Sequence, residues 1–137
     1  MNYLEKLEET GNSLMIYKDG GLLFESNSKG IRPHLEAIEK YSDMLRDTIF
    51  VDKIVGRAAA LLILYSRPLK VYATVISKSG KALFEESNLQ YQFAKEVGNI
   101  KMRDGRIFCP FERMVQNISD PTEAYREILV KMADLKS

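Results

Sequence analysis

The segment from Lys53 to Tyr65 constrains the fold most, because it is apolar on nearly every side. It is rich in alanine and leucine, and it contains the longest apolar run of the chain, from Ala58 to Tyr65. A helix that is hydrophobic all round is buried in a protein core, and this run is far shorter than the roughly 18 residues that cross a membrane. We therefore expect a central buried helix, with Asp52 as its N-cap residue and Arg67-Pro68 as its end.

A hairpin is expected near the N-terminus. The two apolar runs Leu14–Tyr17 and Leu22–Phe24 are separated by Lys18-Asp19-Gly20-Gly21. Asp-Gly between apolar runs favours a tight hairpin turn, because glycine accepts the positive φ that such a turn requires. The hairpin supplies two strands of the predicted sheet.

The clearest helix prediction lies at the C-terminal end. Asp120 is the predicted cap, Pro121 takes the first helical position, and Glu123 follows three residues after the cap, as in a capping box. The other expected elements are helices at 1–10, 33–47, 77–86 and 110–118, strands at 69–76 and 89–97, a short strand or extended segment at 49–51, and a polar loop or hairpin at 99–108. A hairpin followed by alternating helices and strands predicts an α/β fold with a mixed sheet and helices on both faces.

The composition suits one soluble domain over residues 1–137. Hydrophobic residues make up 45% and charged residues 28%, with a formal net charge of +1, which is ordinary for a globular protein. This charge balance argues against a dedicated nucleic-acid binder, and no segment predicts a membrane span or a secretion signal. A single cysteine allows no internal disulfide, so we expect a cytoplasmic protein.

Two segments carry a resemblance to a known family. They read Val51-Asp52-Lys53-Ile54-Val55-Gly56-Arg57-Ala58-Ala59-Ala60-Leu61-Leu62 and Arg103-Asp104-Gly105-Arg106-Ile107-Phe108-Cys109-Pro110-Phe111-Glu112. Together with the opening hairpin, they resemble a family of small bacterial proteins described as domain of unknown function 1893, over nearly the whole chain. The resemblance implies a cytidine-deaminase-like fold, a three-layer α/β/α arrangement, and no known activity.

The implied fold allows a comparison with zinc-dependent deaminases. Those enzymes take one zinc ligand from a His-x-Glu motif at the start of one helix and two from Pro-Cys-x-x-Cys at the start of the next core helix. At the corresponding helix starts we expect Val55-Gly56-Arg57-Ala58 and Cys109-Pro110-Phe111-Glu112, which together retain a single cysteine. Catalytic zinc needs at least three protein ligands, and the only histidine, His34, is expected at the surface of a different element. We therefore expect no zinc site, no cofactor and no zinc-dependent deaminase activity; a site formed by Cys109, Glu112 and His34 is the remaining alternative.

A small anionic or nucleotide-like ligand is expected where two helix starts meet. In the implied fold, the start of the central helix lies beside the one that carries Cys109, and backbone N–H groups at helix starts favour anions. Lys53 and Arg57 add positive charge, and Gly56 allows close approach. In a purely structural interpretation, Asp52 only caps the helix, Gly56 only allows packing, and the two cations are solvated. The candidate ligand-binding residues are Asp52, Lys53, Gly56, Arg57, Arg106, Cys109 and Glu112.

Three functional hypotheses follow from these residues. The leading one is a zinc-free domain that binds a small ligand. The second is an enzyme of unassigned reaction that uses Cys109 as nucleophile or Glu112 as general acid/base. The third is a homodimeric interaction module without a small ligand. An exposed apolar patch without a pocket near Gly56 favours the third hypothesis, and a deep polar cleft there counts against it.

We predict that the protein, purified without chelators, carries no stoichiometric zinc, because one cysteine and one histidine supply too few ligands. Native mass spectrometry and elemental analysis of the same sample measure this directly. Tightly bound, stoichiometric zinc would contradict the prediction and would indicate a site that includes Cys109 and His34.

Overall fold

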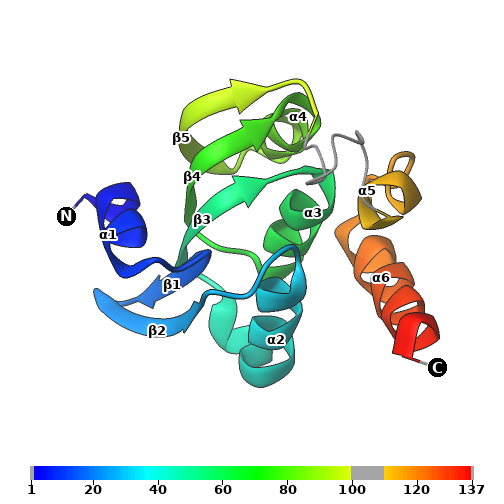
Figure 1. Ribbon diagram of the computed structural model, residues 1–137, viewed down its shortest axis with the longest axis horizontal. Coiled ribbons are helices and arrows are strands. Elements are labelled where there is room, and N and C mark those ends of the chain that lie inside the picture. Colours follow the sequence, from blue (N-terminus) through cyan, green and yellow to red (C-terminus); the bar gives the residue numbers. More distant parts are fainter. Residues whose placement is uncertain (1, 100–109, 137) are drawn as a thin grey trace.

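A mixed sheet of five strands forms the centre of the structure (Figure 1). The structure is a computed structural model, and it describes residues 2–99 and 110–136. In chain order the elements are α1 (Tyr3–Thr10), β1 (Leu14–Lys18), β2 (Gly21–Ser26), α2 (Arg32–Tyr41), the 3-10 helix η1 (Ser42–Leu45), β3 (Ile49–Val55), α3 (Arg57–Ser66), β4 (Lys70–Ser77), α4 (Lys78–Glu86), β5 (Gln90–Val97), α5 (Pro110–Met114) and α6 (Pro121–Lys136).

The strands lie in the order β2-β1-β3-β4-β5. β1 pairs antiparallel with both β2 and β3, whereas β3, β4 and β5 run parallel to one another. Asp19 and Gly20 connect β1 to β2 with φ values of 51° and 84°. Two successive positive φ values are typical of the tight hairpin turn that the sequence predicts. The predicted α/β class with a mixed sheet is thus confirmed.

β3 corrects the expectation for the start of the central helix. Asp52 and Lys53 belong to this strand, and the N-cap residue of α3 is Gly56. β3 is paired on both sides, with β1 and with β4, and the Lys53 N–H also donates to the Ser13 carbonyl oxygen at 2.9 Å. The prediction of a helix from Lys53 is wrong because pairing with two neighbouring strands outweighs the local signal of an N-cap residue.

Two of the other helices are shorter than expected. η1 replaces the second half of the helix predicted at 33–47, since Ser42 has φ 48° and ψ −121° and leaves the helical conformation. α5 ends at Met114. α6 begins as predicted, and Asp120 Oδ2 accepts a hydrogen bond from the Glu123 N–H at 3.1 Å. The loop or hairpin predicted at 99–108 falls almost entirely outside the described residues.

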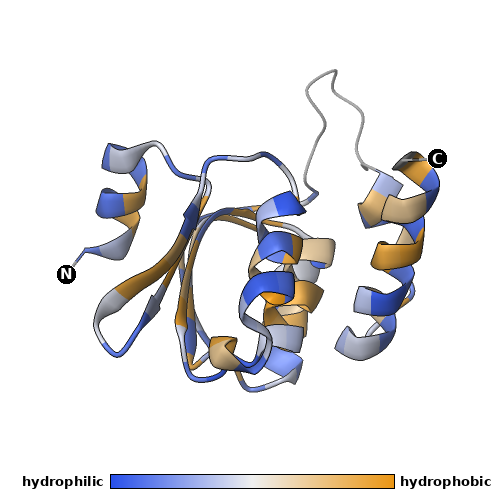
Figure 2. Ribbon diagram, turned by 90° about the horizontal axis from the view of Figure 1, so that it is seen from below, coloured by the Kyte–Doolittle hydropathy of each residue, from blue (hydrophilic) through white to orange (hydrophobic). Residues whose placement is uncertain are grey.

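α3 is the buried central helix that the sequence predicts. All its residues from Ala58 to Ile63 are buried, because the helix packs against α2, α4, α6 and the sheet. Figure 2 shows α1 on one side of the sheet, α2 and α3 on the other, and α5 and α6 further out. The contact between α1 and the sheet is filled by a smaller cluster, Leu7, Met15, Tyr17 and Val51. Helices therefore cover both faces of the sheet.

Gly80 brings the start of α4 close to the junction between β3 and α3. A Cβ atom at Gly80 would lie 3.1 Å from the Gly56 carbonyl oxygen and 3.2 Å from the Val55 carbonyl oxygen. Both neighbours are backbone atoms of a buried junction, so neither can move without disturbing the strand or the helix. The close approach therefore depends on a residue without a side chain.

We predict that Gly80→Ala lowers the free energy of unfolding by about 1 kcal/mol, because overpacking of about 1–3 kcal/mol exceeds the gain in helix propensity of at most about 1 kcal/mol. Urea unfolding at constant m-value measures the change. Gly98→Ala is the matched control, since no atom lies within 4 Å of its added Cβ, and it should leave the midpoint nearly unchanged. A midpoint for Gly80→Ala at or above that of the unchanged protein would contradict the prediction.

Candidate functional site

A buried histidine–aspartate pair connects α2 to β3. His34 Nε2 lies 2.6 Å from Asp52 Oδ2, and the two residues are only 2% and 3% exposed. A carboxylate oxygen accepts hydrogen bonds, so Nε2 donates in this contact. The expectation of a surface His34 is wrong, because the first turn of α2 packs its histidine against the middle of β3. Among the described residues, His34 Nδ1 has no hydrogen-bond partner.

Glu112 caps the start of the central helix from a distant part of the chain. Its Oε1 accepts a hydrogen bond from the Ala58 N–H at 2.9 Å, and its Oε2 accepts one from the Arg57 N–H at 3.1 Å. The first N–H groups of a helix have no partner within the helix, and Gly56 provides no side-chain cap. The starts of α3 and α5 therefore meet, and the carboxylate of Glu112 occupies the position that favours an anion.

Burial dominates the ionisation of Glu112. It raises the pKa of this carboxyl above the ordinary value of 4.5, while the hydrogen bonds from the Ala58 and Arg57 backbone and the charge of Arg57 act in the opposite direction. Desolvation thus favours the protonated form of Glu112, and the hydrogen bonds favour its ionised form; desolvation is the larger of the two effects on the pKa.

The guanidinium group of Arg57 holds the segment between α5 and α6 against α3 and α4. Nε donates to the Val115 carbonyl oxygen at 2.8 Å, and Nη2 donates to the Ile118 carbonyl oxygen at 2.6 Å. Nη1 donates to Ser79 Oγ at 3.0 Å, and Nη2 also lies 3.2 Å from Ser119 Oγ. These contacts give Arg57 a structural role.

A pocket of about 660 Å³ opens beside Asp52. It lies at the carboxyl end of β3, where open α/β sheets commonly bind ligands, and its volume is ordinary for a small-molecule site. Three cations contribute to its lining, Lys29, Arg32 and Lys53. Its apolar lining comes mainly from Ile31, Ile54, Ala59, Phe111 and Met132. The pocket thus combines two buried carboxyl groups, those of Asp52 and Glu112, with an apolar wall and exposed positive charge.

The pocket gathers four of the predicted ligand-binding residues, Asp52, Lys53, Gly56 and Glu112. Arg57 is not part of its lining, and Arg106 and Cys109 lie outside the described residues. Lys29, Arg32 and Phe111 also line the pocket but were not among the predicted residues. Lys29 and Arg32 lie in a segment without a motif, whereas Phe111 lies next to Glu112 in the segment that carries the family resemblance.

The sequence contains one His-x-Glu motif, at His34. His34-Leu35-Glu36 lies at the start of α2, whereas the resemblance to deaminases implies this motif at the start of the central helix, at Val55–Ala58. Glu36 is exposed and His34 contacts Asp52. Within residues 2–99 and 110–136, no three His, Cys, Asp or Glu side chains are grouped so as to hold a metal ion.

None of the helices in the described part of the chain is long and apolar enough to cross a membrane.

The sheet order and the pocket beside the His34–Asp52 pair define a small α/β domain with a ligand-sized cavity at the carboxyl end of a central strand. Residues 2–132 match the family described as Domain of unknown function (DUF1893), and the chain belongs to this family.

A solved structure supports this assignment. The crystal structure of a DUF1893 family protein from Thermotoga maritima is 33% identical in sequence, with a TM-score of 0.86 over 93% of this chain and 86% of that chain. No curated protein matches the chain.

We predict that Glu112 makes the stability of the protein depend on pH. Because the pKa of Glu112 is raised above 4.5 on folding, its contribution to stability is fully present below pH of about 4.5 and is lost as the pH rises through the raised value. The difference between the free energies of unfolding of the unchanged protein and of Glu112→Gln should therefore decrease from about pH 4 upward. Urea unfolding of both proteins at a series of pH values measures this difference.

Glu36→Gln is the matched control, since Glu36 is exposed on α2, and it should show no comparable trend. A relative stability that rises with pH would contradict the prediction. It would mean that the two backbone hydrogen bonds to the ionised carboxylate outweigh its desolvation.

Proposed function

We propose that this protein binds a small nucleotide-like molecule in the pocket beside Asp52, without zinc. The carboxylate of Asp52 faces an amino or imino group on the ring of the ligand, and Lys29, Arg32 and Lys53 face its anionic group. The observation that carries the proposal is a carboxylate only 3% exposed that nevertheless lines a 660 Å³ pocket.

The buried carboxylate supports a ligand that donates hydrogen bonds. Removing a carboxylate from water is costly unless hydrogen bonds replace the lost solvation. His34 supplies one such bond, to Oδ2, and Oδ1 has no hydrogen bond to any described residue. A ligand N–H group that donates to Oδ1 replaces the missing hydrogen bond, so the Asp52 carboxylate favours ligands that carry such a donor.

The remaining lining supports a flat ring with an anionic substituent. Phe111, Ile31 and Met132 offer an apolar surface against which an aromatic ring packs well. Lys29, Arg32 and Lys53 are exposed at the same pocket and attract negative charge. The N–H groups at the start of α3 already donate to Glu112. We therefore assign the binding of the anionic group to the three cationic side chains and not to the helix N-terminus.

A cytidine-deaminase-like relationship belongs to the same proposal. It is supported by the contact between the starts of α3 and α5, which the sequence resemblance implies. Binding without zinc is supported by Gly56, Arg57 and Ala58 at the start of α3, since none of them can ligate the metal. The catalytic alternative gains no support from Glu112, whose carboxylate is engaged in capping α3.

We predict that Asp52→Asn weakens binding of the ligand about tenfold or more, because a hydrogen bond to a charged group contributes about 1.5–3 kcal/mol. The asparagine retains an oxygen that can accept from His34 Nε2, so the fold is preserved. Native mass spectrometry of gently purified protein first gives the mass of any retained ligand. Calorimetric titration with adenosine and cytidine monophosphates then measures affinity.

Asp19→Asn is the matched control, since Asp19 lies in the hairpin turn and should not alter binding. Lys53→Gln should weaken binding of the phosphate-bearing compounds but not of the corresponding nucleosides, with the exposed Lys40→Gln as its control. Nucleotide binding that is unchanged by Asp52→Asn would refute the proposal, as would a protein that retains no ligand and binds neither compound. The same native mass reports whether the protein forms the homodimer of the third hypothesis.

A further inference from the structure

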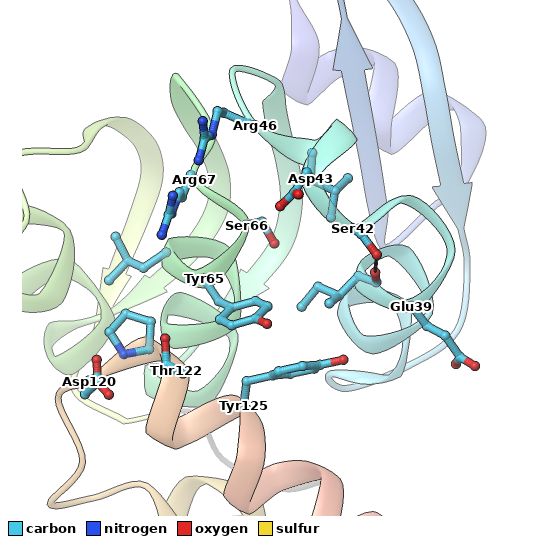
Figure 3. Close-up of a pocket in the computed structure, with 14 residues that line it drawn as sticks. Glu39, Ser42, Asp43, Arg46, Tyr65, Ser66, Arg67, Asp120, Thr122 and Tyr125 are labelled. Atoms are coloured by element: carbon cyan, nitrogen blue, oxygen red, sulfur yellow. Dashed lines mark hydrogen bonds between the residues drawn. The ribbon is translucent and has the colours of Figure 1, made fainter.

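A second cavity lies at the opposite end of the central helix. It has a volume of about 690 Å³ and is lined by α2, η1, the end of α3 and the start of α6 (Figure 3). It shares no lining residue with the pocket beside Asp52. The two cavities are thus separate sites on one domain.

Two arginines meet at this second cavity. The Asp47 N–H donates to the Arg67 carbonyl oxygen at 3.0 Å, which brings the backbone of Arg46 beside that of Arg67. Figure 3 shows their guanidinium groups next to each other at one side of the cavity. Within the described part of the chain, neither guanidinium group has a hydrogen bond or an ion pair. Adjacent like charges repel each other, and an anion between them removes this repulsion and accepts their N–H groups.

The backbone around the two arginines adopts conformations that are costly for side-chain-bearing residues. Arg67 ends α3 in the left-handed region, with φ 57° and ψ 51°, where glycine is the usual residue. Asp47 has φ 63° and Ser42 has φ 48°. Such conformations persist where the surrounding structure imposes them, and they are enriched at binding sites.

An aromatic wall faces the same cavity. The rings of Tyr65 and Tyr125 lie with their centroids 4.4 Å apart, at 30° to each other, and Figure 3 shows both of them inside the cavity below the arginines. A flat ring packs favourably against such a pair.

Three carboxylates also line the cavity, those of Glu39, Asp43 and Asp120, and none of them forms an ion pair with either arginine among the described residues. Asp120 is engaged as the cap of α6, by accepting the Glu123 N–H. The carboxylate of Glu39 points away from the two tyrosines in Figure 3. Asp43 lies near the arginines and forms no ion pair with them in the described residues, so it is placed to accept a donor from a ligand.

We propose that this cavity is a second ligand site, which binds a small aromatic compound through its phosphate or carboxylate group. The anionic group lies between Arg46 and Arg67, and the ring packs against Tyr65 and Tyr125. This site is independent of the ligand proposed for the pocket beside Asp52.

The test is a titration of ¹⁵N-labelled protein with phenyl phosphate, benzoate and inorganic phosphate, followed by amide chemical shifts. We expect phenyl phosphate or benzoate to shift the amides of Arg67 and Tyr125, and inorganic phosphate to bind more weakly because it lacks a ring. Arg46→Gln and Arg67→Asn should each weaken the binding about tenfold; asparagine is chosen because it tolerates the left-handed conformation.

Arg126→Gln is the matched control, since Arg126 is exposed on α6 next to Tyr125 and does not line the cavity. Asp52→Asn should also leave these shifts unchanged, which separates this site from the first pocket. The proposal is overturned if neither aromatic compound shifts Arg67 and Tyr125 at millimolar concentration, or if Arg126→Gln weakens binding as much as Arg46→Gln. Equal binding of inorganic phosphate would overturn the role of the tyrosine wall.

Discussion

The cap that Glu112 places on α3 is the interaction on which the site depends. α3 is buried from Ala58 to Ile63, and the N–H groups at its start have no acceptor within the helix. A carboxylate from α5 supplies both acceptors, and the Arg57 side chain fixes the segment that follows α5. The C-terminal part of the chain is thereby attached to the start of the central helix, and Phe111 and Met132 are brought to the pocket.

The cap by Glu112 determines which chemical groups of a ligand the pocket favours. An open helix start binds anions through its backbone N–H groups, but here a side chain of the protein itself fills that position. The buried carboxylate that we assign to the proposed ligand is instead that of Asp52, which lies 2.6 Å from His34 Nε2. In the proposed site, the Asp52 carboxylate favours hydrogen-bond donors of a ligand, while the exposed lysines and arginine of the same lining favour a negative group.

The two proposed sites lie at the two ends of α3, and α6 contributes to both. Met132 lines the pocket beside Asp52, and Tyr125 lines the cavity beside Arg67. The lining of the first pocket contains a buried acid with a fixed partner, whereas that of the second contains two arginines whose guanidinium groups bond to none of the described residues. The central helix therefore separates two different linings: cations occur in both, but the buried His34–Asp52 pair borders only the first and the Tyr65–Tyr125 pair only the second.

The sequence by itself determined the features that depend on neighbouring residues: the Asp-Gly hairpin, the Asp120 cap of α6, and the burial of an all-apolar central helix. Only the tertiary structure decided that Asp52 lies in a strand, that His34 is buried against it, and that the Arg57 side chain is hydrogen-bonded within the protein. Local patterns report preferences over a few residues, but His34 and Asp52 are 18 positions apart, and Arg57 and Glu112 are 55 positions apart. Their roles follow from strand pairing and helix packing, which no short segment of sequence specifies.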